Sequence, residues 1–197
     1  NQVKQTCGIP CLNFPYKSYK EMHLQVYNQK PLIKTIANKY YAPIGMNSIV
    51  AVMIYGGYNQ EDSVLINKGS IDRGLFQTTI YHTEKDEDKD IIRDEIIRCK
   101  PDATKTKGIK FGNYDKLNEE GFIPENSLVE NRDIIIAKII PIKENRNDPT
   151  KTIKYEDQSK IYRTTEETYV DKNYIDTNGD GYNFAKVRLR TVRKPVI

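Results

Sequence analysis

The segment 48–76 limits how this chain can fold more than any other part of it. Residues 48–55 are almost all apolar and rich in Ile and Val, which predicts a strand buried on both faces. Gly56 and Gly57 break that strand. A second short apolar run at 63–66 predicts another strand, so the backbone must change direction between the two runs.

Two adjacent carboxylates, Glu61 and Asp62, lie at this change of direction. Neighbouring side chains diverge there, so one carboxylate can reach a metal ion or a substrate while the other meets a different partner. The competing interpretation is that both are solvated acids of an ordinary loop. By itself the pair does not decide between the two.

A brief helical turn is expected after the acid pair. Ser70 is placed to cap it, Asp72 follows in its first turn, and Gly74 ends it. Arg73 is expected to hold this loop in place through a carboxylate rather than to contact a substrate.

Length and composition limit the number of domains and the class of protein only broadly. With 197 residues the chain can form one domain or two small ones with a real core. An apolar content of 38% and a charged content of 29% are typical of a soluble protein, and the net charge of +4 suits a polyanionic partner without requiring one. The longest apolar run is far too short to cross a bilayer, and residues 1–4 lack the character of a signal peptide. We therefore expect an intracellular protein with no membrane partner.

The cysteines predict a reducing compartment and no zinc site. Cys7, Cys11 and Cys99 are an odd set that cannot all pair within the chain. The first two have the spacing of half a zinc site, but tetrahedral zinc needs four ligands and no second cysteine pair follows. His23 and His82 are too scattered to complete it.

The middle of the chain predicts a β-rich insertion with long exposed connections. Residues 78–83 alternate as expected for a strand, and residues 133–141 predict another. Residues 84–90 form a mixed-charge run that is expected to be a solvated loop or the start of a helix. Residues 143–160 are polar and charged and are expected to be loop.

The last part of the chain opens with a hairpin signal. Residues 178–181, Asn-Gly-Asp-Gly, accept positive φ and precede a strand at 182–191. Lys186, Arg188 and Arg190 alternate with apolar residues in that strand, so one of its faces is basic. Such a face suits contact with phosphates, but an ordinary solvated strand has the same pattern, and the sequence leaves both interpretations open.

The hairpin also matches the first half of a calcium-binding loop, with Asp176, Asn178 and Asp180 at alternate positions before Gly181. The closing bidentate carboxylate is missing, because Val187 occupies its position, and a strand pattern follows where a helix is needed. We interpret the motif as a turn.

Four motifs in order resemble those of the second-largest subunit of multisubunit DNA-dependent RNA polymerases, whose bacterial relatives are called β. They lie at 49–76, 112–121, 133–142 and 180–195. The first contains Gly-Tyr-Asn-Gln-Glu-Asp-Ser and the second Gly-Asn-Tyr-Asp-Lys-Leu. Near the start, two shorter stretches resemble the eukaryotic, archaeal and viral versions of the subunit, at 4–5 and 29–32. Short motifs recur by chance, but four in the family's order along one chain identify a relative.

The resemblance implies a mainly β fold with short helices, in which an incomplete hybrid-binding β-barrel region is interrupted by a β-rich wall or flap insertion. The hybrid-binding region would span 1–77, the wall 78–186, and the resumed hybrid-binding region 187–197. In the family this last part continues into a Gly-Asp-Lys motif and a basic loop. We therefore expect the chain to be a fragment of the subunit.

The resemblance also implies a role in transcription as part of a nucleotidyltransferase, DNA-directed RNA polymerase. The 3′ hydroxyl of RNA attacks an α-phosphate while two divalent ions stabilise the attacking and leaving oxygens. In this family the largest subunit holds the tightly bound ion. Asp62 resembles the residue that approaches the second, nucleotide-borne Mg²⁺ directly or through water, and Glu61 is its acidic neighbour in the same catalytic site. The fragment alone is expected to be inactive.

Other residues are implied in binding phosphates of RNA or nucleotide. Arg193 resembles a cationic residue near the active centre, where either Arg or Lys serves, and Arg190 belongs to the basic strand before it. Gln5, beside Lys4, resembles a glutamine that contacts RNA phosphate near the growing end, although Cys7 and its neighbour depart from the family pattern.

The partners implied are the largest polymerase subunit, other polymerase subunits, the DNA template, the RNA transcript and NTPs. The enzyme would work in the nucleus of a eukaryotic cell, or in the cytoplasm or virion if it is viral.

Two other functions compete with this one. A non-enzymatic nucleic-acid-binding β module would use the basic strand and the tyrosines, without dependence on Glu61 or Asp62. A self-contained metal-dependent nuclease needs about three well-placed ligands within one chain, and the sequence offers no convergent set of acids and histidines.

Overall fold

The structure is a computed structural model that describes residues 20–40, 45–88, 96–142 and 150–196. It confirms a mainly β protein with short helices, and the described strands form no closed barrel. None of the helices in the described ranges is long and apolar enough to cross a membrane.

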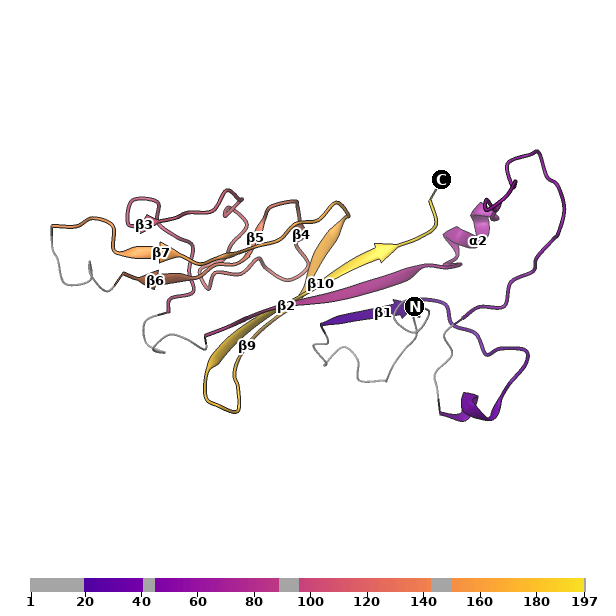
Figure 1. Cartoon of the computed structure of the whole chain (residues 1–197), viewed down its shortest axis with the longest axis horizontal. Helices are drawn as coiled ribbons and strands as arrows, with labels where there is room; N and C mark the ends of the chain where they lie inside the picture. The colour runs from indigo at the N-terminus through magenta and orange to yellow at the C-terminus, as the bar shows by residue number, and fades with distance from the viewer. Residues whose placement is uncertain (1–19, 41–44, 89–95, 143–149, 197) are drawn as a thin grey trace. The chain divides into compact units, whose positions relative to one another are not determined.

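The strands within the described ranges form three sheets, coloured along the chain in Figure 1. The largest has the order β1-β2-β10-β9-β4, a second has the order β3-β7-β6, and β5 pairs with β8. The elements are β1 (Glu21–Gln25), η2 (Ile36–Lys39), α2 (Lys68–Asp72), β2 (Thr78–Glu87), β3 (Thr106–Lys107), β4 (Leu128–Val129), β5 (Ile134–Ile136), β6 (Ile139–Pro141), β7 (Tyr155–Asp157), β8 (Lys160–Ile161), β9 (Thr168–Thr177) and β10 (Asn183–Arg193).

The chain divides into two compact units, which we describe separately. The first combines Asn1–Tyr81 with Val192–Ile197, and the second is His82–Thr191. The sequence-based boundaries at 77/78 and 186/187, and the hybrid-binding and wall assignments attached to them, stay predictions.

The long β9–β10 hairpin is the scaffold of the second unit (Figure 1). Its turn forms as predicted: the Asn178 side-chain oxygen accepts hydrogen bonds from the backbone N–H groups of Asp180 and Tyr182, and Gly181 has φ +80°. Alternate residues of β10, among them Val187 and Leu189, point into the core because strand side chains alternate between faces. The core cluster consists of Phe122, Ile123, Val129, Ile135, Ile136, Val170, Ala185, Val187 and Leu189.

The strand predicted at 133–141 is two strands. β5 pairs with β8, whereas β6 pairs with β7, so the chain passes from one sheet to another between them. Ala137, at this crossing, donates a backbone hydrogen bond to the carbonyl of Gly121. Gly121 has φ +80°, and a Cβ there would lie 2.9 Å from the Ala137 carbonyl oxygen, so only glycine fits this close approach.

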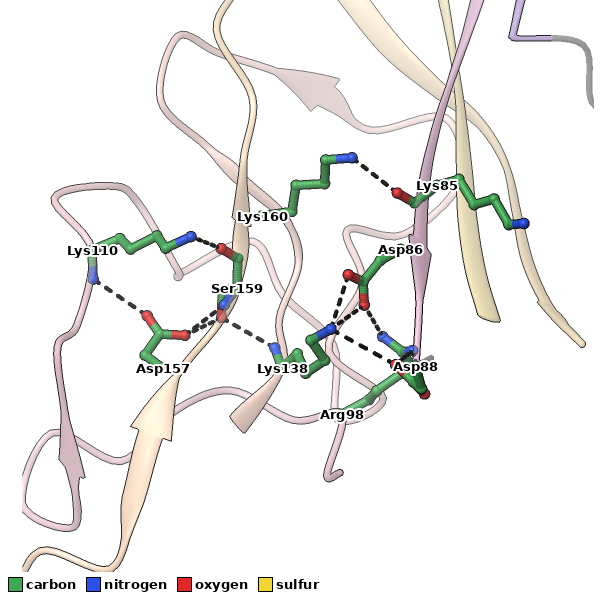
Figure 2. A network of polar contacts seen from close by, with 9 residues as sticks. All are labelled: Lys85, Asp86, Asp88, Arg98, Lys110, Lys138, Asp157, Ser159 and Lys160. Atoms are coloured by element: carbon green, nitrogen blue, oxygen red, sulfur yellow. Dashed lines mark hydrogen bonds and ion pairs between the residues drawn. The ribbon is translucent and has the colours of Figure 1, made fainter. Parts of the chain in front are cut away.

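The mixed-charge run after residue 83 is not the expected solvated loop or helix start in its described part. Residues 84–87 complete β2, and Asp88 is 5% exposed. The prediction was wrong because the carboxylates on one face of β2 meet cations from distant parts of the chain (Figure 2). The loop expected at 143–160 was also wrong in part, since β7 and the start of β8 lie within it.

In the first unit, neither apolar run around the acid pair forms a strand. Residues 48–55 pair with no strand in the described ranges, and their side chains are exposed, Val52 at 98% and Ile54 at 88%. Residues 63–66 likewise have no ladder partner there. Without a neighbouring strand, the burial that the apolar sequence predicts cannot occur.

Candidate functional site

The acid pair sits in a four-residue turn. The Ser63 backbone N–H donates to the Gln60 carbonyl at 3.1 Å, so Glu61 and Asp62 are the two central residues. Glu61 has φ +53°, which is uncommon for a residue with a Cβ. The turn follows Gly56 and Gly57, which also have positive φ, so the change of direction predicted from the sequence is confirmed.

Both acidic side chains are exposed. No hydrogen bond or ion pair to another described residue engages the carboxylate of Glu61 or Asp62. Mg²⁺ keeps several of its waters and binds through one or two protein carboxylates, so this pair fits an auxiliary ion that other groups also hold. The described parts of the chain contain no cluster of three His, Cys, Asp or Glu side chains, so a complete metal cage would need ligands from elsewhere.

The short helix α2 follows the acid pair, and its N-cap is Asn67 rather than the predicted Ser70. The Asn67 side-chain oxygen accepts from the Ser70 backbone N–H at 2.9 Å. Gly74, with φ +104°, lies just beyond the helix as predicted. Arg73 donates to the Ser70 hydroxyl at 3.2 Å, so it holds the loop through a hydroxyl and not through the expected carboxylate.

The basic face of β10 is partly neutralised by Asp171. Arg188, 5% exposed, places Nε 2.6 Å from Asp171, and the Arg190 guanidinium lies 3.2 Å from the other oxygen of the same carboxylate. Arg190 also donates to the Asn126 side-chain oxygen at 3.0 Å. Arg188 is therefore neither a solvated nor an open phosphate-binding residue in this structure, whereas the Arg190 side chain stays 30% exposed.

The remaining candidates are Arg193, Lys4 and Gln5. Arg193 is exposed at the end of β10. Lys4 and Gln5 lie outside the described residues, as do Cys7 and Cys11.

A buried network of charges, which the sequence did not reveal, fixes the end of β2 (Figure 2). Lys138 lies 2.8 Å from Asp86 and 3.7 Å from Asp88, and Arg98 contacts the same two carboxylates at 3.0 and 2.8 Å. Two cations thus face two anions. The Lys138 backbone N–H donates to the Ser159 hydroxyl, which links this quartet to a second polar cluster.

That second cluster surrounds Asp157. Its carboxylate accepts from the backbone N–H groups of Ser159 and Lys110 at 2.9 and 3.3 Å, and from the Tyr114 hydroxyl. Burial, together with the hydrogen bond to Asp157, raises the pKa of Tyr114. These contacts satisfy one another, so we assign the network to structure rather than to chemistry.

On β2, Glu84 is held ionised. His82 lies 2.8 Å from one carboxylate oxygen and Lys160 2.5 Å from the other. The hydrogen bond from His82 first, and then the contact with Lys160, lower the pKa of Glu84 to about 2, against the opposing effect of burial.

Comparison with known proteins gives one consistent result. The whole chain, residues 1–197, matches the family model described as RNA polymerase Rpb2, domain 6. It is 37% identical over 202 residues to DNA-directed RNA polymerase II subunit 2 of Arabidopsis thaliana and 38% identical over 204 residues to subunit RPB2 of Schizosaccharomyces pombe, in each case with 98% of this chain covered. A probable RPB2 homologue of Invertebrate iridescent virus 3 is 38% identical over 203 residues, with all of this chain covered. The chain spans 17% of the length of these relatives.

Proposed function

Since the chain belongs to the Rpb2 family of second-largest RNA polymerase subunits, we propose that it forms part of the active-centre cleft of a DNA-directed RNA polymerase. There it contributes to binding the RNA–DNA hybrid and to positioning the Mg²⁺ ion that arrives with the incoming nucleotide. The fragment supplies only part of this centre, because the tightly bound ion needs a carboxylate cluster from another subunit.

The chemistry assigned to Asp62 is electrostatic. Negative charge builds up on the pyrophosphate as it leaves, and a second Mg²⁺, when bound, would supply the positive charge that stabilises it. Asp62, directly or through a bound water, would hold that ion against the triphosphate. One carboxylate is enough for this task, because the nucleotide phosphates and water supply the other ligands.

The observation that carries this proposal is the free, exposed carboxylate of Asp62 at a defined turn. A structural acid is expected to have a cation or backbone N–H groups as partners, as Asp86 and Asp157 do. Asp62 has none among the described residues. Glu61 adds negative charge beside it, and its positive φ sets the direction in which the chain leaves towards Asp62.

The proposal also includes phosphate contacts. Arg193 would neutralise RNA or nucleotide phosphates, with Gln5 and Lys4 near the growing RNA end and Arg190 adding charge through the exposed part of its side chain. The partners are then the largest subunit and other subunits, the DNA template, the transcript and NTPs. The enzyme would act in a nucleus if cellular, and in the cytoplasm or virion if viral.

The test is the substitution Asp62→Ala in the complete polymerase. We expect slower nucleotide addition and a raised magnesium requirement, with subunit assembly unchanged, when single-nucleotide extension is measured across a magnesium titration. Elongation that is unchanged at every magnesium concentration would remove Asp62 from the site.

A second candidate function is a nucleic-acid-binding β module, and one observation favours it. Lys85 and Lys186 place their ammonium groups 5.1 and 4.9 Å from the centroid of the Phe184 ring. Lys172 lies 5.5 Å from the Tyr174 ring, which faces Lys186 across the β9–β10 pair. Rings flanked by cations suit bases and phosphates. This function predicts salt-sensitive binding that does not change when Asp62 is replaced.

A further inference from the structure

We propose that Asn59 and Ser63 are positioning residues, which act on the metal ion only through the turn that carries Glu61 and Asp62. The inference rests on the proposed role of Asp62. The Asp62 carboxylate has no partner among the described residues, so no side-chain contact orients it, and the backbone of the turn sets the direction of its Cα–Cβ bond. The contacts that hold the turn at residues 60–63 therefore decide where Asp62 points.

Asn59 uses both ends of its amide for this purpose. The side-chain oxygen accepts from the backbone N–H of Tyr55 at 3.2 Å, and the side-chain N–H₂ group donates to the carbonyl of Met53 at 2.7 Å. The segment before the turn has no ladder partner in the described ranges, so the Asn59 side chain bonds backbone groups that a neighbouring strand would otherwise satisfy. Because one contact needs an acceptor and the other a donor, neither Asp nor Ala can make both.

Ser63 closes the other side of the turn. Its hydroxyl donates to the Tyr58 carbonyl at 3.0 Å and lies still closer to the carbonyl of Gln60, while its backbone N–H also bonds Gln60. Two residues that flank the acid pair therefore fix the loop at both ends. Each does so through side-chain contacts to the backbone.

The strained residue lies between them. A Glu at φ +53° occupies a sparsely populated region, and such a conformation persists only when the surrounding contacts hold it. If either Asn59 or Ser63 is lost, Glu61 is free to relax to negative φ. That rotation would turn the following residue, Asp62, away from the direction seen here.

The experiment uses the complete polymerase with Asn59→Ala and Ser63→Ala, each alone and each combined with Asp62→Asn. The readout is the magnesium concentration that gives half-maximal single-nucleotide addition. We expect each single variant to raise this concentration by about tenfold, less than the roughly 100-fold that misplacing a reacting group by about 1 Å can cost. In the Asp62→Asn background neither should raise it further, because the group being positioned is already gone.

Two further variants separate positioning from general damage. Ser63→Thr keeps the hydroxyl and should restore the wild-type magnesium requirement. Asn67→Ala removes the cap of α2 in the same unit. The hydrogen bonds of Asn67 among the described residues go to Ser70 and Ile71 rather than to the turn, so this variant should leave the requirement unchanged.

The outcomes are distinct. If Asp62→Asn itself leaves the magnesium requirement unchanged, the proposed function fails. If Asp62→Asn raises it but Asn59→Ala and Ser63→Ala do not, the positioning role is wrong while the proposed function stands. The positioning role is also overturned if the two variants raise the requirement equally with and without Asp62.

Discussion

Lys138 places its ammonium group 2.8 Å from a carboxylate oxygen of Asp86, and only 7% of its side chain is exposed. A lysine this deeply buried is tolerated because it lies between two carboxylates, those of Asp86 and Asp88, while Arg98 supplies the second positive charge. The contact joins the end of β2 to the crossing between β5 and β6. The second unit therefore depends on a polar contact as well as on its apolar core.

Replacing Lys138 with Met should destabilise this region by about 3 kcal/mol, because it leaves the buried carboxylate of Asp88 and the partly buried carboxylate of Asp86 facing one arginine. Hydrogen exchange of the Ile139 backbone amide in the complete subunit measures the loss, since that amide bonds the Ile97 carbonyl next to the quartet. Lys100→Met is the matched control. Lys100 pairs with Asp115 at 3.2 Å with both side chains largely exposed, so its loss should not change the exchange rate. Equal effects of the two substitutions would contradict a special role for the quartet.

The contacts of Glu84 with His82 and Lys160 predict that the protein loses stability in acid. The pKa of Glu84 falls from its ordinary value of 4.5 to about 2 in the folded protein, so its contribution to stability is complete above pH 4.5. As the pH falls from 4.5 towards 2, Glu84 is protonated in the unfolded chain but stays ionised in the folded chain. The contribution of Glu84 to the free energy of unfolding is therefore lost over this range. Exchange of the Asp88 amide, which bonds the Asn183 carbonyl, reports on this strand. Above pH 4.5, the Asp88 amide should exchange faster in the Glu84→Gln variant than in the wild type. The two exchange rates should converge between pH 4.5 and 2. A constant ratio of rates would show that Glu84 does not titrate in this way.

Arg193→Ala should weaken retention of short transcripts or nucleotide in the complete enzyme, because a phosphate would lose its counter-charge. The measurement is the yield of abortive products during initiation, which we expect to rise several-fold. Arg193→Lys keeps the charge and should give a yield close to that of the wild type. An abortive yield that is normal for Arg193→Ala would exclude the residue from the site.

The sequence predicted local features well where neighbouring residues decide the conformation. The hairpin at Asn178–Gly181 and the change of direction at Gly56 and Gly57 depend on backbone freedom and on side chains only a few positions away, and both are confirmed. The polymerase motif around Glu61 and Asp62 identified the family, which the comparisons confirm. Their part in metal binding stays a proposal.

The features that were missed depend on residues far apart in the chain. The charged run after residue 83 looked solvated because its partners, Arg98 and Lys138, lie 12 and 52 residues beyond Asp86. The predicted strand at 48–55 failed for a related reason, since no described strand lies beside it to pair with its backbone. The roles of Asn59 and Ser63 could have been suspected, because Asn and Ser side chains often bond to nearby backbone in turns.

The central claim is that Asp62 lies beside the metal ion that an incoming nucleotide carries, and metal-directed cleavage tests it most directly. Fe²⁺ replaces Mg²⁺ in the complete polymerase, and added hydrogen peroxide oxidises it to Fe³⁺, releasing hydroxide and a hydroxyl radical that cuts the polypeptide near each bound ion. We predict that cleavage around residues 58–65 appears when NTP is added, and that Asp62→Asn reduces this NTP-dependent cleavage while cleavage near the tightly held ion in the largest subunit stays constant. Cleavage at 58–65 that is absent, or that does not depend on NTP, would contradict the account.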